Sequence, residues 1–122
     1  MASVLVVDDD AAFRGLAARM LAEEGLVVVG EADGAESARA AAARLRPEAV
    51  LVDVMLAGDD GIELAHELAR LPWRPRVLLT STAPDAVRGQ ELEADGVIGF
   101  VPKEALPGAP LARLLGAGAE GV

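Results

Sequence analysis

Short apolar runs alternate with amphipathic segments along this chain. Five runs rich in valine and leucine are too short for helices and are typical of buried strands. These runs lie at 4–7, 26–29, 49–52, 76 to 79 or 80, and 97–101. Elsewhere apolar side chains recur at helical spacing, which predicts five helices. These helices are expected at 11–24, 35–45, 62–71, 84–93 and 111–115.

The alternation of strands and helices predicts an α/β fold. We expect a flavodoxin-like, doubly wound, five-stranded parallel sheet with strand order 2-1-3-4-5 and helices on both faces. No internal repeat or linker is visible, so 1–122 is predicted to form a single domain. Its core is expected at about 3–115, with a frayed C-terminal tail. In such a sheet the ligand crevice lies beyond the carboxyl ends of the first and third strands.

Composition narrows the function classes. The chain is 52% hydrophobic, which excludes general disorder, and it lacks cysteine, which excludes disulfides and thiolate chemistry. The apolar runs are too short to cross a membrane, and the N-terminus does not resemble a secretion signal, so we expect a cytoplasmic protein. A net charge of −9 argues against direct binding to nucleic acid or to an anionic membrane.

Three acids, Asp8, Asp9 and Asp10, follow the first predicted strand directly. Adjacent carboxylates repel one another and cost least where a cation neutralises them, so this run is a candidate site for a hard metal ion. The alternative is a solvated turn in which one aspartate caps the next helix. We expect Asp8 and Asp9 to be the metal-binding acids and Asp10 to begin the helix.

Polar residues also follow the third, fourth and fifth strands. Asp53 ends the third, Thr80 or Ser81 ends the fourth, and Lys103 follows the fifth. A carboxylate can attack phosphorus to form an acyl phosphate, provided that cations neutralise the incoming phosphoryl group. Mg²⁺ held by the acids and the ammonium of Lys103 can do this, and a hydroxyl can donate to a phosphoryl oxygen. Thr80 is preferred over Ser81 because 75–79 already forms a full strand before it.

Lys103 stands out for a second reason. It is the only lysine among eleven basic residues, and the other ten are arginine. Lysine and arginine are not interchangeable where a compact charge must lie close to an anion. We therefore expect this lysine to have a specific role.

Taken together, these motifs resemble the receiver (response-regulator, CheY-like) domain family of bacterial two-component signalling, over about residues 3–115. The matching pieces are Val4-Leu5-Val6-Val7-Asp8-Asp9-Asp10, Leu51-Val52-Asp53 with Gly61, Val77-Leu78-Leu79-Thr80-Ser81 and Gly99-Phe100-Val101-Pro102-Lys103. Each piece is weak alone, but together they occur in the right order on the right elements.

The resemblance implies a phosphoacceptor and a metal site. Asp53 would accept a phosphoryl group from a phosphohistidine on a sensor histidine kinase. Asp8 and Asp9 would hold Mg²⁺ with Asp53 and the backbone carbonyl of Met55. Lys103 would pair with the phosphoryl oxygens.

It also implies a switch. Thr80 would move toward the phosphoryl group and Phe100 would turn inward, which would change the face built from the fourth helix, the fifth strand and the last helix. Such a domain is not an enzyme beyond self-catalysed phosphotransfer and slow autodephosphorylation. Its partners would be the kinase and a downstream effector domain or protein, and a phosphorylation-linked homodimer is left open. The fourth helix, 84–93, holds Gly89 and few apolar residues, so we expect it to be mobile.

Two positions depart from the family pattern. Ala57 stands where the family often has proline, and Glu104 follows Lys103 where proline joined by a cis bond is usual. A cis bond before Glu104 would cost about 3 kcal/mol, so we expect a trans bond or a strained exception. These departures favour an alternative, a degenerate receiver that acts as a phosphorylation-independent interaction module.

A second alternative is a phosphatase of the haloacid dehalogenase type. Asp8 and Asp10 could imitate the opening motif of such enzymes. Ala12 stands where threonine or valine is expected, however, and no acidic pair follows Lys103. The receiver is therefore the leading hypothesis.

Overall fold

A five-stranded parallel sheet lies at the centre of the computed structural model, which describes residues 2–82 and 96–116. Its strands are β1 (Ser3–Val7), β2 (Val27–Ala32), β3 (Ala49–Asp53), β6 (Arg76–Ser81) and β7 (Val97–Pro102). They lie in the order β2-β1-β3-β6-β7, and each neighbouring pair is parallel. This confirms the predicted order 2-1-3-4-5, since the short strands β4 and β5 form a separate sheet.

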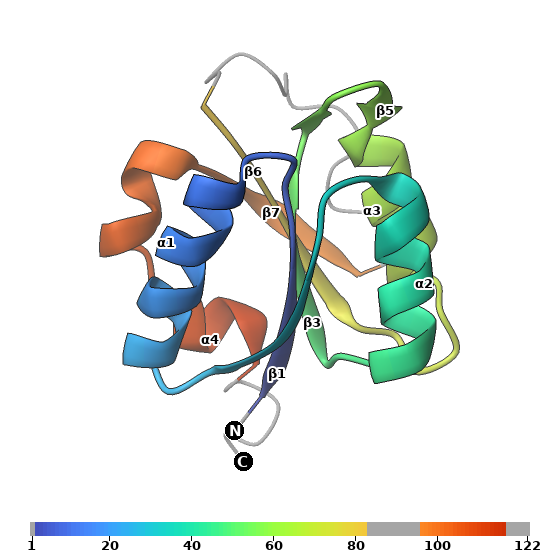
Figure 1. Ribbon diagram of the computed structural model, residues 1–122. Coiled ribbons are helices and arrows are strands. Elements are labelled where there is room, and N and C mark those ends of the chain that lie inside the picture. The colour runs from blue at the N-terminus through green and yellow to red at the C-terminus, as the bar shows by residue number, and fades with distance from the viewer. Residues whose placement is uncertain (1, 83–95, 117–122) are drawn as a thin grey trace.

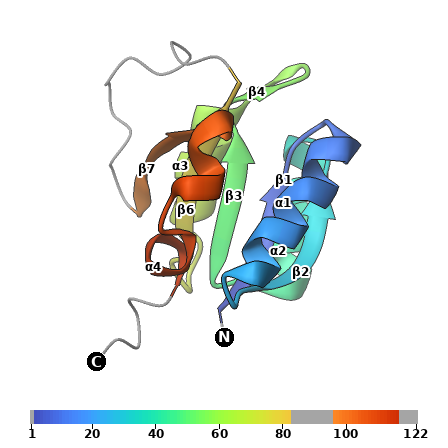
Figure 2. The same cartoon turned by 90° about the vertical axis from the view of Figure 1, so that its left-hand side faces the viewer.

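Helices cover both faces of this sheet (Figure 1). They are α1 (Ala11–Glu23), α2 (Ala35–Leu45), α3 (Gly61–Ala69), the 3-10 helix η1 (Lys103–Gly108) and α4 (Leu111–Leu115). Figures 1 and 2 show α1 and α4 on one face of the sheet and α2 and α3 on the other. None of these described helices has the length and apolar character needed to span a membrane. The helix predicted at 84–93, with its expected mobility, lies outside the described residues.

Side chains alternate between two apolar cores along each strand, because successive strand residues point to opposite faces. On β3, Val50 and Val52 pack with α2 and α3. Ala49 and Leu51 belong to the second core, with α1, η1 and α4. This period places Asp53 on the same face as Leu51, toward α1.

The structure corrects the sequence prediction at three places. No strand was predicted between 52 and 62, but an antiparallel hairpin of β4 (Met55–Leu56) and β5 (Asp59–Asp60) forms there before α3 begins. The 3-10 helix η1 was not predicted, because Pro107 lies inside it. The second strand lies later than the predicted 26–29 and ends at Ala32, because pairing with β1 continues to the pair Val7–Ala32.

Asp10 caps the first helix, as the sequence predicted. Its side chain accepts hydrogen bonds from the backbone N–H groups of Ala12, at 3.0 Å, and Phe13, at 3.4 Å. These groups have no partner within the helix, so the cap stabilises the first turn. At the other end Gly25 has a φ of +84°, the left-handed conformation that commonly follows a helix.

This cap can be tested by substitution. Asp10→Ala is expected to lower the free energy of unfolding by about 1 kcal/mol, because two N–H groups lose their acceptor. Asp10→Asn is expected to leave it nearly unchanged, since asparagine caps about as well. Urea unfolding followed by circular dichroism measures both. Equal losses in the two variants would show that the charge, and not the cap, is what matters.

Candidate functional site

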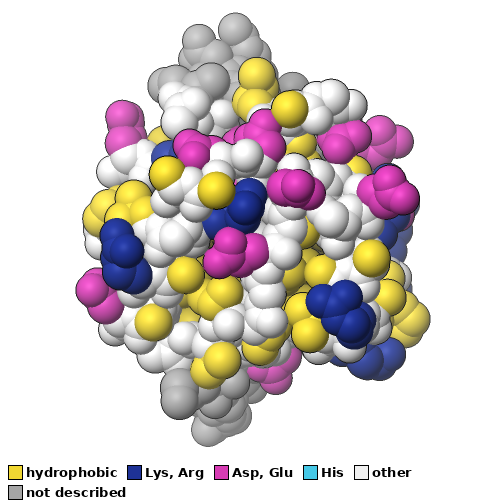
Figure 3. Space-filling view, in the orientation of Figure 1, with side chains coloured by type: hydrophobic (Ala, Val, Ile, Leu, Met, Phe, Trp, Pro, Cys, Tyr) yellow, Lys and Arg dark blue, Asp and Glu magenta, His cyan; other side chains and the backbone are white. Residues whose placement is uncertain are grey.

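The carboxyl ends of β1, β3 and β6 meet at one edge of the sheet, at the top of Figure 1. The register pairs Val7 with Val52 and Asp53 with Thr80, so the polar residues that follow the apolar runs become neighbours. Acidic side chains gather over this upper part of the molecule (Figure 3). The topology therefore places the predicted site residues from separate strands around one crevice.

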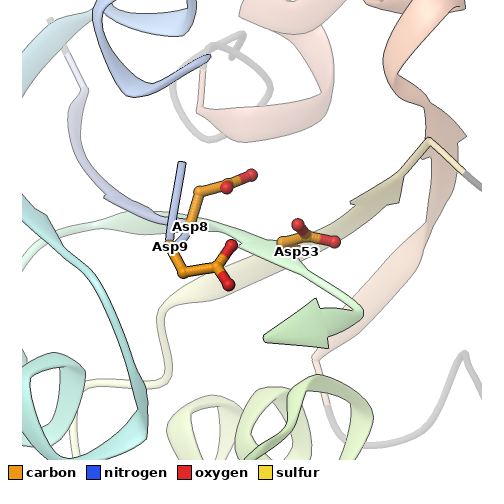
Figure 4. A group of neighbouring side chains, drawn as sticks. All are labelled: Asp8, Asp9 and Asp53. Atoms are coloured by element: carbon orange, nitrogen blue, oxygen red, sulfur yellow. The ribbon is translucent and has the colours of Figure 1, made fainter. Parts of the chain in front are cut away.

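Asp8, Asp9 and Asp53 form an acidic cluster, in which each offers a carboxylate oxygen within 4.8 Å of the others (Figure 4). Asp8 and Asp53 are buried, whereas Asp9 is exposed. Backbone N–H groups orient Asp53 and Asp9. Met55 N–H donates to Asp53 Oδ1 at 2.9 Å, and Ala57 N–H donates to Asp9 Oδ2 at 3.1 Å. The segment that follows β3 thus holds both Asp53, at the end of β3, and Asp9, after β1.

Lys103 brings a positive charge to this cluster from β7 and the start of η1. Its Nζ lies 2.8 Å from Asp8 Oδ2 and 3.3 Å from Asp53 Oδ2. The lysine side chain is only 13% exposed, so both ion pairs are screened far less than surface pairs. The peptide bond between Lys103 and Glu104 is trans, as expected from the cost of a cis bond before a residue other than proline. The lysine therefore reaches the carboxylates without a cis peptide after it.

The electrostatics of the pocket affect the pKa values of Asp53 and Lys103 differently. Burial raises the pKa of the Asp53 carboxyl; Asp8 adds to the rise, while the Met55 N–H and Lys103 oppose it. Burial lowers the pKa of the Lys103 ammonium, but the hydrogen bond and charge of Asp8, with the charge of Asp53, outweigh it. The net pKa of Lys103 is raised. The pocket thus keeps the lysine charged and disfavours the ionised form of Asp53.

Thr80 supplies the hydroxyl on the face of the sheet that carries Asp53. Thr80 pairs with Asp53 in the register, and paired residues of parallel strands point to the same side. Ser81, one residue later, points to the opposite side by the same period. The Thr80 Oγ1 atom is buried and has no hydrogen-bond partner among the described residues. A buried hydroxyl without a partner is costly and marks a place where a polar group could bind.

The other two predicted residues lie close to the site but outside the cluster. Met55 contacts Asp53 through its backbone N–H, and its side chain is exposed. Phe100 pairs with Leu79 and packs, half-buried, against the core under α2 and α3. It therefore lies across the sheet from the carboxylates. The roles predicted for the Met55 carbonyl and for Phe100 remain predictions.

The donor set fits a small divalent cation. Oxygen ligands from carboxylates suit Mg²⁺, which holds opposite ligands about 4 Å apart. The carboxylate oxygens of the cluster lie within 4.8 Å of one another, so a small movement of these side chains would bring the oxygens to the spacing that Mg²⁺ requires. Asp8 Oδ2 is buried and lies 2.8 Å from the Lys103 ammonium, and a carboxylate oxygen with one such neighbour keeps a lone pair that a cation could bind. The acids themselves thus support the predicted metal site.

Two residues of α1 at this site were not singled out from the sequence. Arg14 Nη1 donates to the backbone carbonyl of Asp8 at 2.6 Å, and its Nε donates to Glu31 Oε1 at 2.9 Å. The ring of Phe13 lies over the ammonium of Lys103. Helical spacing assigns Phe13 to the core, and nothing in the local sequence pairs Arg14 with a strand end. Only the three-dimensional fold shows these contacts.

A doubly wound parallel sheet with three acids, a buried hydroxyl and a lysine at one edge is the arrangement that the sequence predicted for a receiver domain. The family model described as the response regulator receiver domain matches residues 4–114. The chain therefore belongs to the response regulator receiver domain family. This confirms the resemblance seen in the sequence.

Individual relatives support the same conclusion. The chain is 37% identical over 106 residues to the response regulator GacA of Pseudomonas aeruginosa, which covers 86% of this chain and 50% of that protein. It is 40% identical over 78 residues to the transcriptional regulatory protein PdtaR of Mycobacterium tuberculosis, which covers 64% of this chain and 38% of that protein. The chain spans about half the length, or less, of these curated relatives.

Solved structures share the fold. One is a response regulator protein from Burkholderia pseudomallei with a phosphorylated aspartic acid, calcium ion and citrate. It has a TM-score of 0.76 and 28% identity, and covers 98% of this chain and 70% of that one. Another is the BeF3-activated N-terminal receiver domain of RstA from Klebsiella pneumoniae, with a TM-score of 0.73 and 28% identity, covering 92% and 94%.

Proposed function

We propose that this domain is a phosphorylation-dependent receiver that accepts a phosphoryl group on Asp53 from a phosphohistidine of a sensor histidine kinase. One observation carries the proposal. Asp53 is a buried carboxylate with an ammonium at 3.3 Å on one side, and the neighbouring strand carries a buried hydroxyl that has no partner in the part of the chain that the structure describes. A carboxylate in ordinary structural use would have its charge fully satisfied. Here the surrounding groups are suited to receive further anionic oxygens.

In this reaction an oxygen of Asp53 attacks phosphorus, the bond from phosphorus to the histidine nitrogen breaks, and the imidazole leaves with the electron pair. The product is an acyl phosphate. Lys103 neutralises phosphoryl oxygens, and Thr80 donates its hydroxyl hydrogen to one of them. Both groups lie on the α1 side of the sheet together with Asp53, so neither needs to cross the sheet.

Asp8, Asp9 and Asp53 would hold Mg²⁺, with the backbone carbonyl of Met55 as a fourth protein ligand. The bound ion would supply positive charge where the phosphoryl group carries negative charge. The acidic cluster supports this assignment, because three close carboxylates need a counter-charge beyond that of one lysine.

Arg14 is expected to support the metal site from outside it. A double variant, Arg14→Met with Glu31→Gln, removes one positive and one negative charge, so the net charge is unchanged. The carbonyl of Asp8 then loses its donor, and the acidic turn is less firmly held. We expect Mg²⁺ to bind about tenfold more weakly, as for other residues that orient metal ligands. Calorimetric titration measures this.

The single variant Glu31→Gln is the control for this measurement. It changes the charge but keeps the Arg14 contact to Asp8, and is expected to bind Mg²⁺ within about twofold of the wild type. Equal affinities in the double variant and the control would mean that Arg14 does not position the acids.

The proposal also includes a switch. Thr80 and Phe100 lie on adjacent strands, β6 and β7, but on opposite faces of the sheet. Movement of Thr80 toward a phosphoryl group would reach Phe100 through the pairing of β6 with β7, and Phe100 would turn inward on its own face. The face that changes would include β7 and α4. The fourth helix, 84–93, which belongs to this proposal, lies outside the described residues.

Incubation with acetyl phosphate and Mg²⁺, followed by intact mass measurement, tests the proposed function. The expected result is a gain of one phosphoryl group that disappears when Mg²⁺ is chelated. No gain under conditions that label another receiver domain would contradict the proposal and favour the phosphorylation-independent interaction module. The kinase partner, a downstream effector and a cytoplasmic location are proposals that rest on the family alone.

A further inference from the structure

The ammonium of Lys103 lies against the face of an aromatic ring. Its Nζ is 4.0 Å from the centroid of the Phe13 ring. Phe13 belongs to α1, is 9% exposed, and packs in the core shared with η1 and α4. The face of an aromatic ring carries partial negative charge and attracts a cation, more strongly when both are shielded from water.

The ring completes a set of three neighbours around the ammonium. Asp8 and Asp53 lie at 2.8 and 3.3 Å, and the ring covers a further side. A ring and a carboxylate differ in how many N–H donors of the ammonium they occupy. It attracts the ammonium without adding a full negative charge or a strong hydrogen-bond acceptor, so the N–H donors remain free for anionic oxygens.

The position of the ring is tied to the acidic turn itself. Asp10, which follows the two metal-binding acids, accepts a hydrogen bond from the backbone N–H of Phe13 at 3.4 Å. The first turn of α1 therefore keeps a fixed relation to Asp8. Lysine has a flexible four-carbon stem, so a fixed ring that holds its end reduces the number of positions that the charge visits.

We propose that Phe13 is a positioning residue for Lys103, whose ring holds the ammonium beside Asp53 and shields it from water. The inference deepens the proposed function by naming a residue through which phosphoryl transfer is prepared. The ring does not touch the reacting atoms; it acts through the lysine. A ring that serves only to fill the core would affect stability without affecting the lysine.

The composition of the chain permits a direct test, because Lys103 is its only lysine. Protein made with ¹³C,¹⁵N-labelled lysine gives a single set of lysine signals that needs no assignment. In the wild type the ε-proton signals are expected to be shifted upfield by the ring current of Phe13. In Phe13→Leu this shift is lost, and ¹³Cε relaxation shows a more mobile side chain.

Leu21→Val serves as the control. Leu21 is buried on the same helix and in the same core but does not belong to the site, so its truncation destabilises the fold without moving the lysine signals. Identical lysine shifts and mobility in the wild type and in Phe13→Leu would overturn the proposal.

A fluorinated ring separates electrostatics from packing. Site-specific replacement of Phe13 by 3,4,5-trifluorophenylalanine keeps the shape of the ring but removes the negative charge of its face. The expected results are a more mobile Lys103 and a rate of labelling by acetyl phosphate and Mg²⁺ that falls about three- to tenfold. Unchanged mobility and rate would show that the ring only packs, and the proposal would be wrong. If the wild type itself is not labelled, the proposed function fails, and the lysine mobility alone decides the role of Phe13.

Discussion

Asp53→Asn is expected to abolish labelling by acetyl phosphate, because an amide oxygen does not form the acyl phosphate. The mass gain of the wild type should fall below detection in this variant, a loss of at least about a hundredfold. Asp60→Asn is the matched control: it makes the same acid-to-amide change at the cap of α3, where asparagine also caps. It should be labelled as fully as the wild type.

The same experiment separates the receiver from the haloacid dehalogenase type of phosphatase. In the receiver, Asp8→Asn lowers labelling by weakening the metal site, but the phosphoryl group stays on Asp53. A label that survives in Asp53→Asn and is lost in Asp8→Asn would favour the phosphatase and refute our assignment of the nucleophile.

Asp53→Asn should also stabilise the metal-free domain. The pKa of Asp53 is raised by burial, so its ionised form is less favoured in the folded than in the unfolded chain. That carboxyl therefore favours folding most below its unfolded pKa, and this contribution is lost as the pH rises through the folded pKa. At neutral pH the asparagine variant should melt a few degrees higher. The difference should shrink toward acidic pH, which thermal melts at several pH values will measure.

Gly61→Ala is expected to produce the largest loss of stability. A Cβ on Gly61 would lie 2.7 Å from both the Cα and the carbonyl oxygen of Val54 and would also meet the carbonyl of Asp53. These are backbone atoms, so no flexible side chain can move aside. We expect the free energy of unfolding to fall by about 3 kcal/mol, the upper part of the range for overpacking. Labelling should fall as well, because the obstruction displaces the end of β3.

Gly15→Ala provides the matched control for this substitution. Gly15 lies within α1, and a Cβ there would meet nothing within 4 Å. Alanine should therefore stabilise the protein by about 0.5–1 kcal/mol, through its better helix propensity. Urea unfolding compares the two variants. If both shift the midpoint in the same direction, the close approach at Gly61 does not constrain the structure.

The sequence predicts the parallel sheet well because each strand is encoded locally. The run 49–52 is apolar on both faces, as a central strand requires, and Asp53 ends it. The helix at 35–45 has the same bounds in the structure, since Pro47 and the loop before Ala35 limit it on both sides. Where neighbouring residues decide the structure, periodicity and turn residues are sufficient.

The site could be predicted only as a set of residues, and not as a set of contacts. The acids, hydroxyl and lysine could be predicted from their places after strands. The contact of Phe13 with Lys103 and that of Arg14 with Asp8 could not, because they depend on how α1 packs across strand ends far away in sequence. The β4–β5 hairpin was missed for a similar reason. Its strands have two residues each, and long-range hydrogen bonds, not propensity, hold them in place.

The β4–β5 hairpin links the acidic turn after β1 to the start of α2. Ala57 N–H donates to Asp9 at one end, and Asp59 Oδ2 accepts from Ala35 N–H at the other, 3.0 Å away. The second bond caps α2, whose own Gly34 has no side chain to do so. Most surface loops tolerate inserted residues, because closing a longer loop costs little. Here an insertion between Ala57 and Asp59 would break both bonds, so the length of this exposed turn is as constrained as a core position.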